Sequence, residues 1–364
     1  METSGKKRTV LIYPVLLILT MLTLVMRPAQ VTAAVRTSLY NCINAVIPSL
    51  FAMMALSRLM ISSGAYRLLG RPFGIAARYI FRIPEDMLSV FFISVTAGYP
   101  VGASLTAQAY RDNAVTLEQA EDMLCWCFGA GPAFILGTVG MGVFGSMRCG
   151  ALLFVSCIAA DILTGIVTAL KRPVPQKSGK GCDIRFTADM AEEAVGSAGK
   201  AMFGMCTVIL LVSALLAIPC ESAAAAHIAD TAGKLLGADP YDMIVLMRSA
   251  AEISNISFLT GDERMLPAAA AALSFGGISV LMQVRSVCGG LRIGRMAVMR
   301  IFAAGTAYIV CHLLNNIMIG AGTAAVNAGS DISIRHNPPI LSVFLLIMTI
   351  FLLSQKRVEK NEKM

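Results

Sequence analysis

The stretch Met87–Tyr110 reads MLSVFFISVTAGYPVGASLTAQAY, and it decides the fold because it is long enough to cross a membrane yet interrupted at its centre. It contains no Asp, Glu, Lys or Arg, and a spanning helix needs roughly 20 mostly apolar residues. Near its midpoint lies Gly98-Tyr99-Pro100-Val101-Gly102. Proline removes a backbone donor and glycine weakens a helix, so the sequence predicts two short helices joined by a break.

The composition around this stretch is that of a membrane protein. Of the 364 residues, 56% are hydrophobic and 14% charged, against roughly 25% charged in an ordinary soluble domain. The net charge of +8 comes from short basic clusters between apolar runs, which does not indicate nucleic-acid binding. Ten cysteines and three histidines give no zinc or haem spacing, so we expect no metal and no cofactor.

Ten apolar stretches could lie in the membrane. They are Val10–Met26, Thr37–Ser57, Met87–Tyr110, Met123–Met147, Cys149–Leu170, Ala201–Cys220, Met243–Gly261, Met265–Val284, Ile301–Gly322 and Pro339–Ser354. The first follows a basic cluster and is either a signal peptide cleaved near Ala33 or a retained anchor; we expect an anchor.

The distribution of basic residues predicts the orientation. Five segments hold 20 of the 30 Lys and Arg residues. They are the tail before Val10, Arg67–Arg82, Lys171–Arg185, Arg285–Arg300 and the tail from Lys356. We therefore expect a multi-pass protein of the cell membrane with both termini in the cytoplasm.

With this orientation, the number of apolar stretches between two loops does not match the number of membrane crossings that the loops require. A re-entrant hairpin in each half removes this parity problem. Between the basic Arg67–Arg82 segment and Arg148 the chain must cross an odd number of times, yet two apolar stretches lie there. We predict that Met87–Tyr110 is a re-entrant hairpin opening to the cytoplasm. Its neighbour Met123–Met147 then spans the membrane, with a break at Gly129-Ala130-Gly131-Pro132.

The second half repeats the problem with the opposite sense. Met243–Gly261 becomes a hairpin opening outward, and Met265–Val284 becomes a span broken near Gly276-Gly277. The predicted fold is an all-α polytopic membrane protein built as an inverted repeat of helix, re-entrant hairpin, broken helix and helix. Direct sequence similarity between the halves is weak, so the repeat is predicted from topology.

The domain boundaries follow from this arrangement. They are 1–33 for an N-terminal anchor helix, 34–170 for the first repeat, 171–200 for a cytoplasmic linker and interfacial helix, 201–322 for the second repeat, and 323–364 for a C-terminal transmembrane helix and basic tail. The segment 66–82 is either an interfacial helix or a basic loop.

Four breaks within the membrane predict a polar centre, because each leaves backbone groups unpaired unless protein, water or a ligand satisfies them. Half-helix N-termini favour an anionic group, and half-helix C-termini favour cations. We predict that the substrate site is formed by Gly98, Tyr99, Pro100, Gly102, Gly129, Gly131, Pro132, Glu252, Ser254, Asn255, Gly276, Gly277, Ser279 and Gln283.

Two acidic residues interrupt apolar stretches. Glu252 either lines the solute or cation site or forms a structural ion pair with Arg248, one helical turn earlier. Asp161 either titrates in a coupling step or caps a neighbouring broken segment. The sequence contains no G-x-S-x-G, H-E-x-x-H or Walker motif, so we expect no catalytic residues and no enzyme activity.

Four segments resemble sporulation integral membrane proteins of the YlbJ (SpoVV) type, which carry the nucleoside-recognition (Gate) domain. They are Val46–Met60, Thr96–Ala103, Gly131–Gly137 and Leu273–Val284, within a region from Ala34 to Asn316. The resemblance implies two Gate-like repeats and a fold similar to concentrative nucleoside transporters. It carries function to Gly98–Gly102, Gly129–Pro132, Glu252–Asn255 and Gly276–Gln283. In the family an asparagine often precedes the Pro-x-Phe element, whereas this chain has Cys127-Phe128-Gly129-Ala130.

The resemblance also implies a function, because characterised relatives move dipicolinate from the mother cell toward the forespore. We expect a transporter of a small anionic solute, dipicolinate in this reading, with a coupling proton or cation. Its partners would be the solute and the lipid bilayer, in the mother-cell-derived outer forespore membrane. The alternatives are a non-transporting sporulation assembly or regulatory protein and a transporter of a nucleoside-like solute. The sequence leaves the oligomeric state open.

Overall fold

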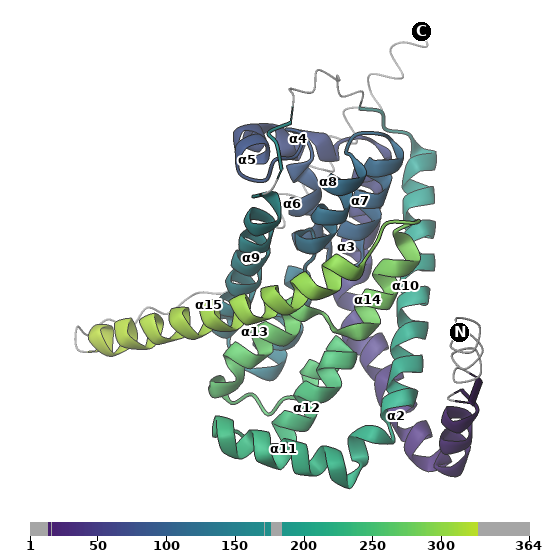
Figure 1. Cartoon of the computed structure of the whole chain (residues 1–364), viewed down its shortest axis with the longest axis vertical. Helices are drawn as coiled ribbons and strands as arrows, with labels where there is room; N and C mark the ends of the chain where they lie inside the picture. Colours follow the sequence, from purple (N-terminus) through teal and green to yellow (C-terminus); the bar gives the residue numbers. More distant parts are fainter. Residues whose placement is uncertain (1–13, 16, 171, 176–183, 327–364) are drawn as a thin grey trace, which may run out of the picture. The chain divides into compact units, whose positions relative to one another are not determined.

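A computed structural model describes residues 14–15, 17–170, 172–175 and 184–326 (Figure 1). All regular elements in these ranges are helical, which confirms the all-α fold. Residues 1–316 form one compact unit and residues 317–364 a second, of which the structure describes only the end of α15. The predicted span Pro339–Ser354, and most of the domain predicted for 323–364, lie outside the described residues, as do residues 1–13 of the predicted anchor.

The first repeat follows the predicted order. Its elements are α2 (Pro28–Asn41), η1 (Cys42–Val46), α3 (Ile47–Ser62), α4 (Tyr66–Gly70), η2 (Arg71–Phe73), α5 (Gly74–Tyr79), α6 (Leu88–Ala97), α7 (Val101–Arg111), α8 (Leu117–Trp126), η3 (Ala133–Val143) and α9 (Met147–Ala169). The helices α2, η1 and α3 are continuous. The segment 66–79 is helical, as one of the two readings of its sequence predicted.

The second repeat contains the same kinds of element in the same order. They are α10 (Ala188–Leu216), η4 (Pro219–Glu221), α11 (Ala223–Leu236), α12 (Pro240–Ala251), η5 (Ile253–Phe258), η6 (Glu263–Met265), α13 (Leu266–Phe275), α14 (Gly277–Val287) and α15 (Gly294–Val326). Each repeat thus has a long helix, a short helical segment, a hairpin, an interrupted helix and a second long helix.

The first hairpin is formed by α6 and α7, which turn at Gly98 with φ of 80°. A methyl group on Gly102, in the first turn of α7, would lie 2.5 Å from the Ser94 Cβ on α6 and would overlap the carbonyl oxygen of Cys127. The two arms and the first break are therefore in direct backbone contact. Only glycine fits there without a shift of the surrounding chain.

The second hairpin is formed by α12 and η5, which turn at Glu252. Its open end is closed by the Asp242 carboxylate, which accepts hydrogen bonds from the Thr260 backbone N–H at 2.9 Å and from the Thr260 hydroxyl at 2.7 Å. The chain therefore returns to its starting level within this segment. A hairpin is present at both places where the parity argument predicted one.

The long helices of the two repeats pack side by side in opposite directions. Near the end of α2, in the first third of the continuous α2–η1–α3 helix, the Ser38 hydroxyl donates to the Ser213 hydroxyl near the end of α10 at 2.6 Å. At the other end, the Arg185 N–H just before α10 donates to the Ser63 carbonyl just after α3 at 3.2 Å. Two helices that begin their repeats thus run antiparallel, as an inverted repeat requires.

Three connections that the charge distribution placed on one side of the membrane, and the α7–α8 connection that the predicted hairpin placed there, meet at one end of this unit. The Gln119 amide after the α7–α8 connection donates to the Arg82 carbonyl at 3.4 Å, and Arg82 donates to the Leu170 carbonyl at 3.0 Å. Arg292, between α14 and α15, forms an ion pair with Glu121 at 3.1 Å. Asp122 is buried beside it between Arg172 and Arg295.

The remaining connections meet at the opposite end. The Cys149 thiol lies 3.7 Å from Glu263 Oε1, and Arg264 donates to the Gly237 carbonyl at 3.3 Å. In Figure 1, α4 and α5 lie at the first end and α11 at this one. The short helices between long helix and hairpin are therefore also inverted between the repeats.

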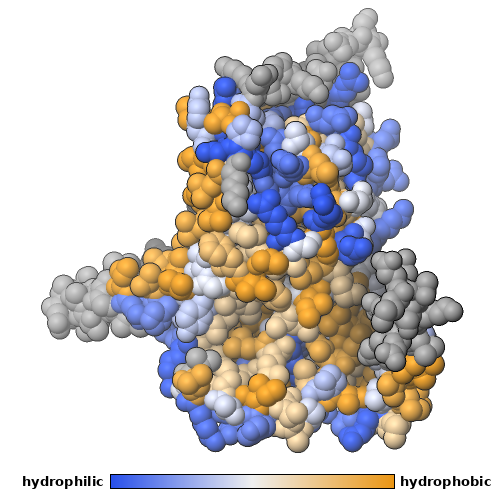
Figure 2. Space-filling view, viewed as in Figure 1, coloured by the Kyte–Doolittle hydropathy of each residue, from blue (hydrophilic) through white to orange (hydrophobic). Residues whose placement is uncertain are grey.

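The described part contains five helical segments that are long and apolar enough to cross a membrane. They are Pro28–Ser62, Met147–Ala169, Ala188–Leu216, Glu263–Val287 and Gly294–Ile317. Figure 2 shows hydrophobic residues over the middle of the visible face and hydrophilic residues toward its two ends. The interior of the first repeat holds Trp126, which is buried and stacks on Phe81 with ring centroids 4.7 Å apart. This is the architecture of a polytopic membrane protein.

Three element boundaries differ from the sequence prediction. Residues 188–200 of the segment 171–200, which was predicted to contain a linker and an interfacial helix, are the beginning of α10. α8 begins at Leu117, before the predicted start at Met123, because Thr116 and Gln119 form a capping box. α11 has no counterpart in the prediction.

Candidate functional site

The four breaks converge at the centre of the unit. A methyl group on Gly131, in the first interrupted helix, would lie 3.4 Å from the Gly98 Cα at the tip of the first hairpin. A methyl group on Gly277, in the second interrupted helix, would lie 3.2 Å from the Ile253 nitrogen at the tip of the second hairpin. Each hairpin tip and its interrupted helix also touch the other such pair. Gly276 in the second interrupted helix lies so close to Phe128 in the first break that a methyl group added to Gly276 would lie 2.6 Å from the Phe128 ring.

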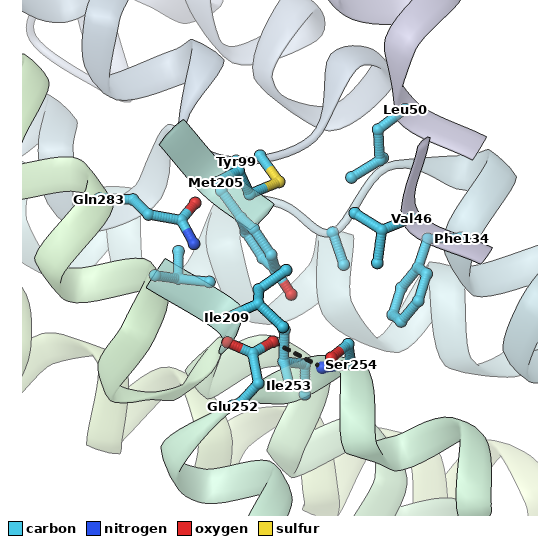
Figure 3. A pocket seen from close by; sticks show the side chains of 12 residues that line it. Val46, Leu50, Tyr99, Phe134, Met205, Ile209, Glu252, Ile253, Ser254 and Gln283 are labelled. Carbon is cyan, nitrogen blue, oxygen red and sulfur yellow. Dashed lines mark hydrogen bonds between the residues drawn. The ribbon is translucent and has the colours of Figure 1, made fainter. Parts of the chain in front are cut away.

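A small cavity lies among these breaks (Figure 3). It has a volume of about 30 Å³, room for one or two water molecules. Its walls come from both long helices, both hairpin tips and both interrupted helices. The lining residues are Val46, Leu50, Tyr99, Ala130, Phe134, Met205, Ile209, Glu252, Ile253, Ser254, Val280 and Gln283.

Glu252 supplies the carboxylate in this cavity wall. It is 1% exposed, and one of its oxygens accepts a hydrogen bond from the Ser254 N–H at 3.0 Å, which caps η5 (Figure 3). Its other oxygen, Oε2, has no hydrogen-bond partner among the described residues. A buried polar atom without a partner carries a desolvation cost of about 1–3 kcal/mol, more when the group is charged, unless a ligand, water or proton satisfies it.

Two further polar atoms of the lining are buried and unpartnered within the described chain. They are Tyr99 Oη and Gln283 Oε1. Figure 3 shows the Tyr99 and Gln283 side chains, from the first hairpin and from α14, on the walls of the same space as Glu252. A phenol, an amide and a carboxyl group thus offer hydrogen-bonding capacity to whatever occupies this space.

Four of the predicted site residues line the cavity: Tyr99, Glu252, Ser254 and Gln283. The others shape the breaks or lie beside the lining. Asn255 bonds back to the Glu252 carbonyl at 2.9 Å, and Ser279 is fully buried beside Glu252. The break-forming residues are Gly98, Pro100, Gly102, Gly129, Gly131, Pro132, Gly276 and Gly277.

The apolar lining from the long helices and Asn41 were not predicted from the sequence. Val46, Leu50, Met205 and Ile209 carry no sequence signal, because an apolar residue facing a cavity looks like one facing lipid. Asn41 is buried and donates to the Ser254 carbonyl at 2.9 Å, which ties the first long helix to the second hairpin. An asparagine within an apolar run was the signal that could have found it.

Glu252 is not paired with Arg248, so the structural ion pair considered from the sequence is absent from the described chain. α12 ends at Ala251, and the backbone of Glu252 is extended, which removes the helical spacing that would bring the two side chains together. Arg248 lies beside Cys220 instead. Of the two readings of Glu252, the structure favours the cavity-lining one.

The structure changes the count of cytoplasmic basic residues from which the orientation was predicted, because Arg300 does not lie in a loop. It was assigned to a cytoplasmic segment, but its side chain is 0% exposed inside the protein. Its Nη2 donates to Asp161 Oδ1 at 2.7 Å, and its Nη1 donates to the Ser274 carbonyl in the last turn of α13 at 3.2 Å. Asp161 therefore does not cap a broken segment directly; it holds the arginine that does.

The lining contains no Lys, Arg or His side chain. Apart from the phenol of Tyr99, its one ionisable group is the carboxyl of Glu252. An anionic solute in this cavity would therefore lie next to a carboxyl group, with no cationic side chain in the lining. Its binding would be unfavourable unless Glu252 is protonated or a cation outside the lining compensates the charge.

Comparison with known proteins identifies one kind of relative. The chain is 31% identical over 162 residues to "Sporulation integral membrane protein YlbJ" of Bacillus subtilis (strain 168). The match covers 44% of this chain and 40% of that protein, so the chain spans well under two thirds of its relative. No family model matches, and no solved structure matches. The predicted resemblance to sporulation integral membrane proteins of this type is confirmed, while the Gate domain stays a prediction.

Proposed function

We propose that this homologue of a sporulation integral membrane protein is a transporter that carries a small organic anion between the two sides of a membrane. The solute would bind at the centre, where the two hairpins and two interrupted helices meet. On this proposal the protein is not an enzyme and acts without a cofactor. Dipicolinate is the solute that the family resemblance implies, and the outer forespore membrane is the location that it implies.

The observation that carries the proposal is the cavity at the meeting point of the four breaks. Its walls hold three buried polar atoms, on Tyr99, Glu252 and Gln283, that have no partner in the part of the chain that the structure describes and that a purely structural core would bury only at a cost. Helices broken at mid-membrane around a polar centre are the usual construction of a secondary transporter. A helper protein of the septum would have no use for such a centre.

The size of the cavity supports a moving mechanism. At about 30 Å³ it is well below the roughly 300–1,000 Å³ of a pocket that holds a small organic ligand. The walls must therefore separate before a solute enters. In an inverted repeat this occurs when one half moves against the other around a fixed central site.

The cavity lining favours a second candidate, a neutral solute of nucleoside type. A phenol, an amide and a carboxyl group without a cation suit the hydrogen-bonding edges of a heterocycle and its sugar. Dipicolinate also has a heteroaromatic ring, but it carries two carboxylates. The two candidates therefore differ in their need for a positive charge at the site.

Uptake into proteoliposomes tests the proposal. We expect the purified native protein to accumulate radiolabelled dipicolinate above protein-free vesicles, with uridine as the comparison solute. Removing the Gln283 amide, whose N–H group can donate to a solute carboxylate, by Gln283→Ala should lower uptake by roughly tenfold, as expected for the loss of one solute hydrogen bond of about 1.5 kcal/mol.

The matched control is Gln108→Ala, because Gln108 lies on α7 and bonds only to Asp112 and Arg111 outside the cavity. This variant should transport as the native protein does. Uridine uptake without dipicolinate uptake would replace the anionic solute by the nucleoside-like one. Folded native protein that moves neither solute would refute the transport proposal and favour a non-transporting assembly protein.

A further inference from the structure

Arg300 is a fully buried cation on α15 that links both repeats. Its guanidinium bonds to Asp161 on α9 and to the Ser274 carbonyl on α13, and its Cζ lies 4.6 Å from the centroid of the Phe128 ring in the first break. One side chain thus contacts the last helix of the first repeat and both interrupted helices. No cavity-lining residue has this combination of charge and position.

Only one pair of aromatic rings separates this cation from the cavity. The Phe128 ring stacks at an angle on the Tyr99 ring with centroids 4.7 Å apart, and Tyr99 lines the cavity. A methyl group on Gly276 would lie 2.6 Å from the Phe128 ring and 3.6 Å from the Tyr99 ring, so both rings are held closely against the second break. The rings therefore form the wall between Arg300 and the solute space.

The guanidinium has unused donor capacity. An arginine offers five N–H donors in a planar fork that matches a carboxylate. Two hydrogen bonds of Arg300 go to Asp161 and to the Ser274 carbonyl, and its Nε has no partner among the described residues. The Ser274 hydroxyl beside it is likewise buried and unpartnered. The group can therefore hold a second acceptor.

A buried ion pair of this kind is weak evidence for a role in stability. Removing two charges from water costs several kcal/mol per ion, and well-packed apolar residues often stabilise a protein as much or more. Asp161 and Arg300 both lie on apolar helices, with exposures of 2% and 0%. Ionisable residues at such positions generally serve a pathway for a solute or a proton.

We propose that Arg300 is the residue that recognises the solute carboxylate and that Asp161 is its counter-ion in the empty site. When the Tyr99–Phe128 wall opens, the solute carboxylate takes the place of Asp161 at the guanidinium. Asp161 remains buried without a cation and takes up one proton from solution. This inference rests on the proposed transport function and names its coupling ion as the proton.

The exchange is balanced in charge for the one solute carboxylate that binds at Arg300; the second carboxylate of a dicarboxylate such as dipicolinate takes no part in this step. Before it, the buried site contains Arg300⁺ and Asp161⁻; after it, the site contains Arg300⁺, one solute carboxylate and a neutral Asp161. One proton therefore enters with each carboxylate that binds at Arg300. The mechanism also accounts for an anionic solute in a cavity whose own lining supplies no cation.

Asp161 is the group in this neighbourhood that takes up the proton on this proposal. The charged or titratable groups that face it are Arg300 on α15, Cys127 in the first break, Cys157 on α9 and Tyr99 on the hairpin tip. Arginine stays charged, and thiols and phenols ordinarily lose protons only above neutral pH. Exchange of the carboxylate partner therefore leaves Asp161 as the proton acceptor.

Equilibrium binding of radiolabelled dipicolinate to full-length protein in detergent, at mildly acidic and mildly alkaline pH, tests the proposal. For the native protein, affinity should rise by about tenfold for each unit of falling pH while one proton is taken up. The Asp161→Asn variant keeps the size of the side chain but cannot ionise. Measured in a Glu252→Gln background, so that no other carboxyl group lines the site, the affinity of Asp161→Asn should be independent of pH and, at alkaline pH, higher than that of Glu252→Gln alone.

The double variant Asp161→Asn/Arg300→Gln removes both charges together and leaves no buried ion unpaired. We expect its dipicolinate affinity to fall by roughly tenfold to a hundredfold, the loss of a charge-assisted contact. The control is Glu121→Gln/Arg292→Gln, which removes an ion pair between the repeats whose residues do not line the cavity, and it should bind as the native protein does. Monodisperse elution of each variant shows that it is folded.

The outcomes separate this inference from the function it rests on. If the native protein binds dipicolinate and the double variant binds it equally well with the same pH dependence, the pair is only structural and the inference is overturned. If Asp161→Asn in the Glu252→Gln background retains the pH dependence of Glu252→Gln alone, the proton goes elsewhere and the inference is also overturned. If the native protein binds no dipicolinate at either pH, the anion-transport proposal fails with it.

Discussion

Glu252 shows how a single side chain can serve two purposes at the turn of a hairpin. One carboxylate oxygen of this cavity-lining residue caps η5 by accepting from the Ser254 N–H, and the other has no hydrogen-bond partner within the described residues. The first interaction needs an acceptor but no charge. The second leaves the carboxyl group available to hold a proton or to bond to a solute.

Substitutions of Glu252 should distinguish its role as a hydrogen-bond acceptor from the role of its charge. Glu252→Gln keeps an acceptor for Ser254 and removes a buried ionisable group, so we expect a free energy of unfolding equal to or above that of the native protein. Glu252→Ala leaves the buried Ser254 N–H unpaired and should lower it by about 1–3 kcal/mol. Thermal unfolding of the detergent-purified variants measures both changes. Equal destabilisation by the two would mean that Glu252 has an ionic partner.

At the scale of the element, the hairpins depend on close backbone contact. In α7, Gly102 lies against the Cys127 carbonyl and the Ser94 side chain, so the first hairpin and the first break hold each other in place. This contact positions Tyr99 on the cavity wall. A change in it therefore alters the site without touching a lining residue.

The Gly102→Ala variant should be destabilised by about 1–3 kcal/mol, because its methyl group has no space between two backbones. The measurement is the unfolding temperature together with the yield of monodisperse protein. Gly137→Ala is the matched control, since Gly137 is also helical but has nothing within 4 Å of an added methyl group. A Gly102→Ala variant as stable as this control would contradict the close packing of the hairpin.

Some elements were predictable from sequence and others were not, for physical reasons. A glycine–proline interruption in an uncharged run has few explanations, so both breaks of the first repeat were located correctly. The charged residues at Asp189–Lys200 suggested the membrane surface, but a helix does not have to end where the lipid does, and α10 is continuous there. α11 is too short and polar to register as a span.

The residues of the candidate site were likewise predictable only in part. Tyr99, Glu252 and Gln283 were predicted because a polar residue near a break is conspicuous in an apolar sequence. Arg300 was not, because the sequence cannot distinguish a basic residue in a loop from one that is buried six residues into the next helix. Its partner Asp161 lies on a different helix, and only the three-dimensional packing brings them together.

At the scale of the whole molecule, the two sets of connections meet at opposite ends of the described unit. The ion pairs of Glu121 and Asp122 with Arg292, Arg295 and Arg172 join the repeats at the end predicted to be cytoplasmic. The α11 segment and the Glu263 region lie at the other. Opposite sidedness of these ends is the main requirement of the transport proposal.

Thiol labelling can test this sidedness. Asn113 in the α7–α8 connection and Lys234 on α11 are both exposed. We expect Asn113→Cys to react with a membrane-impermeant reagent only from the cytoplasmic side and Lys234→Cys only from the opposite side. The native chain provides the background, since its nine described cysteines are buried or half-buried. Labelling of both positions from one side would refute the inverted arrangement.

The position of Trp126 has an experimental consequence. It is the chain's single tryptophan, it is 1% exposed, and it is the last residue of α8 before the first break, packed between Phe81 and Phe91. Its fluorescence emission therefore comes from one known place beside the first interrupted helix. A red shift of that emission on adding a solute would report hydration at this point in an unlabelled protein, and its time course would give the rate at which the two halves separate.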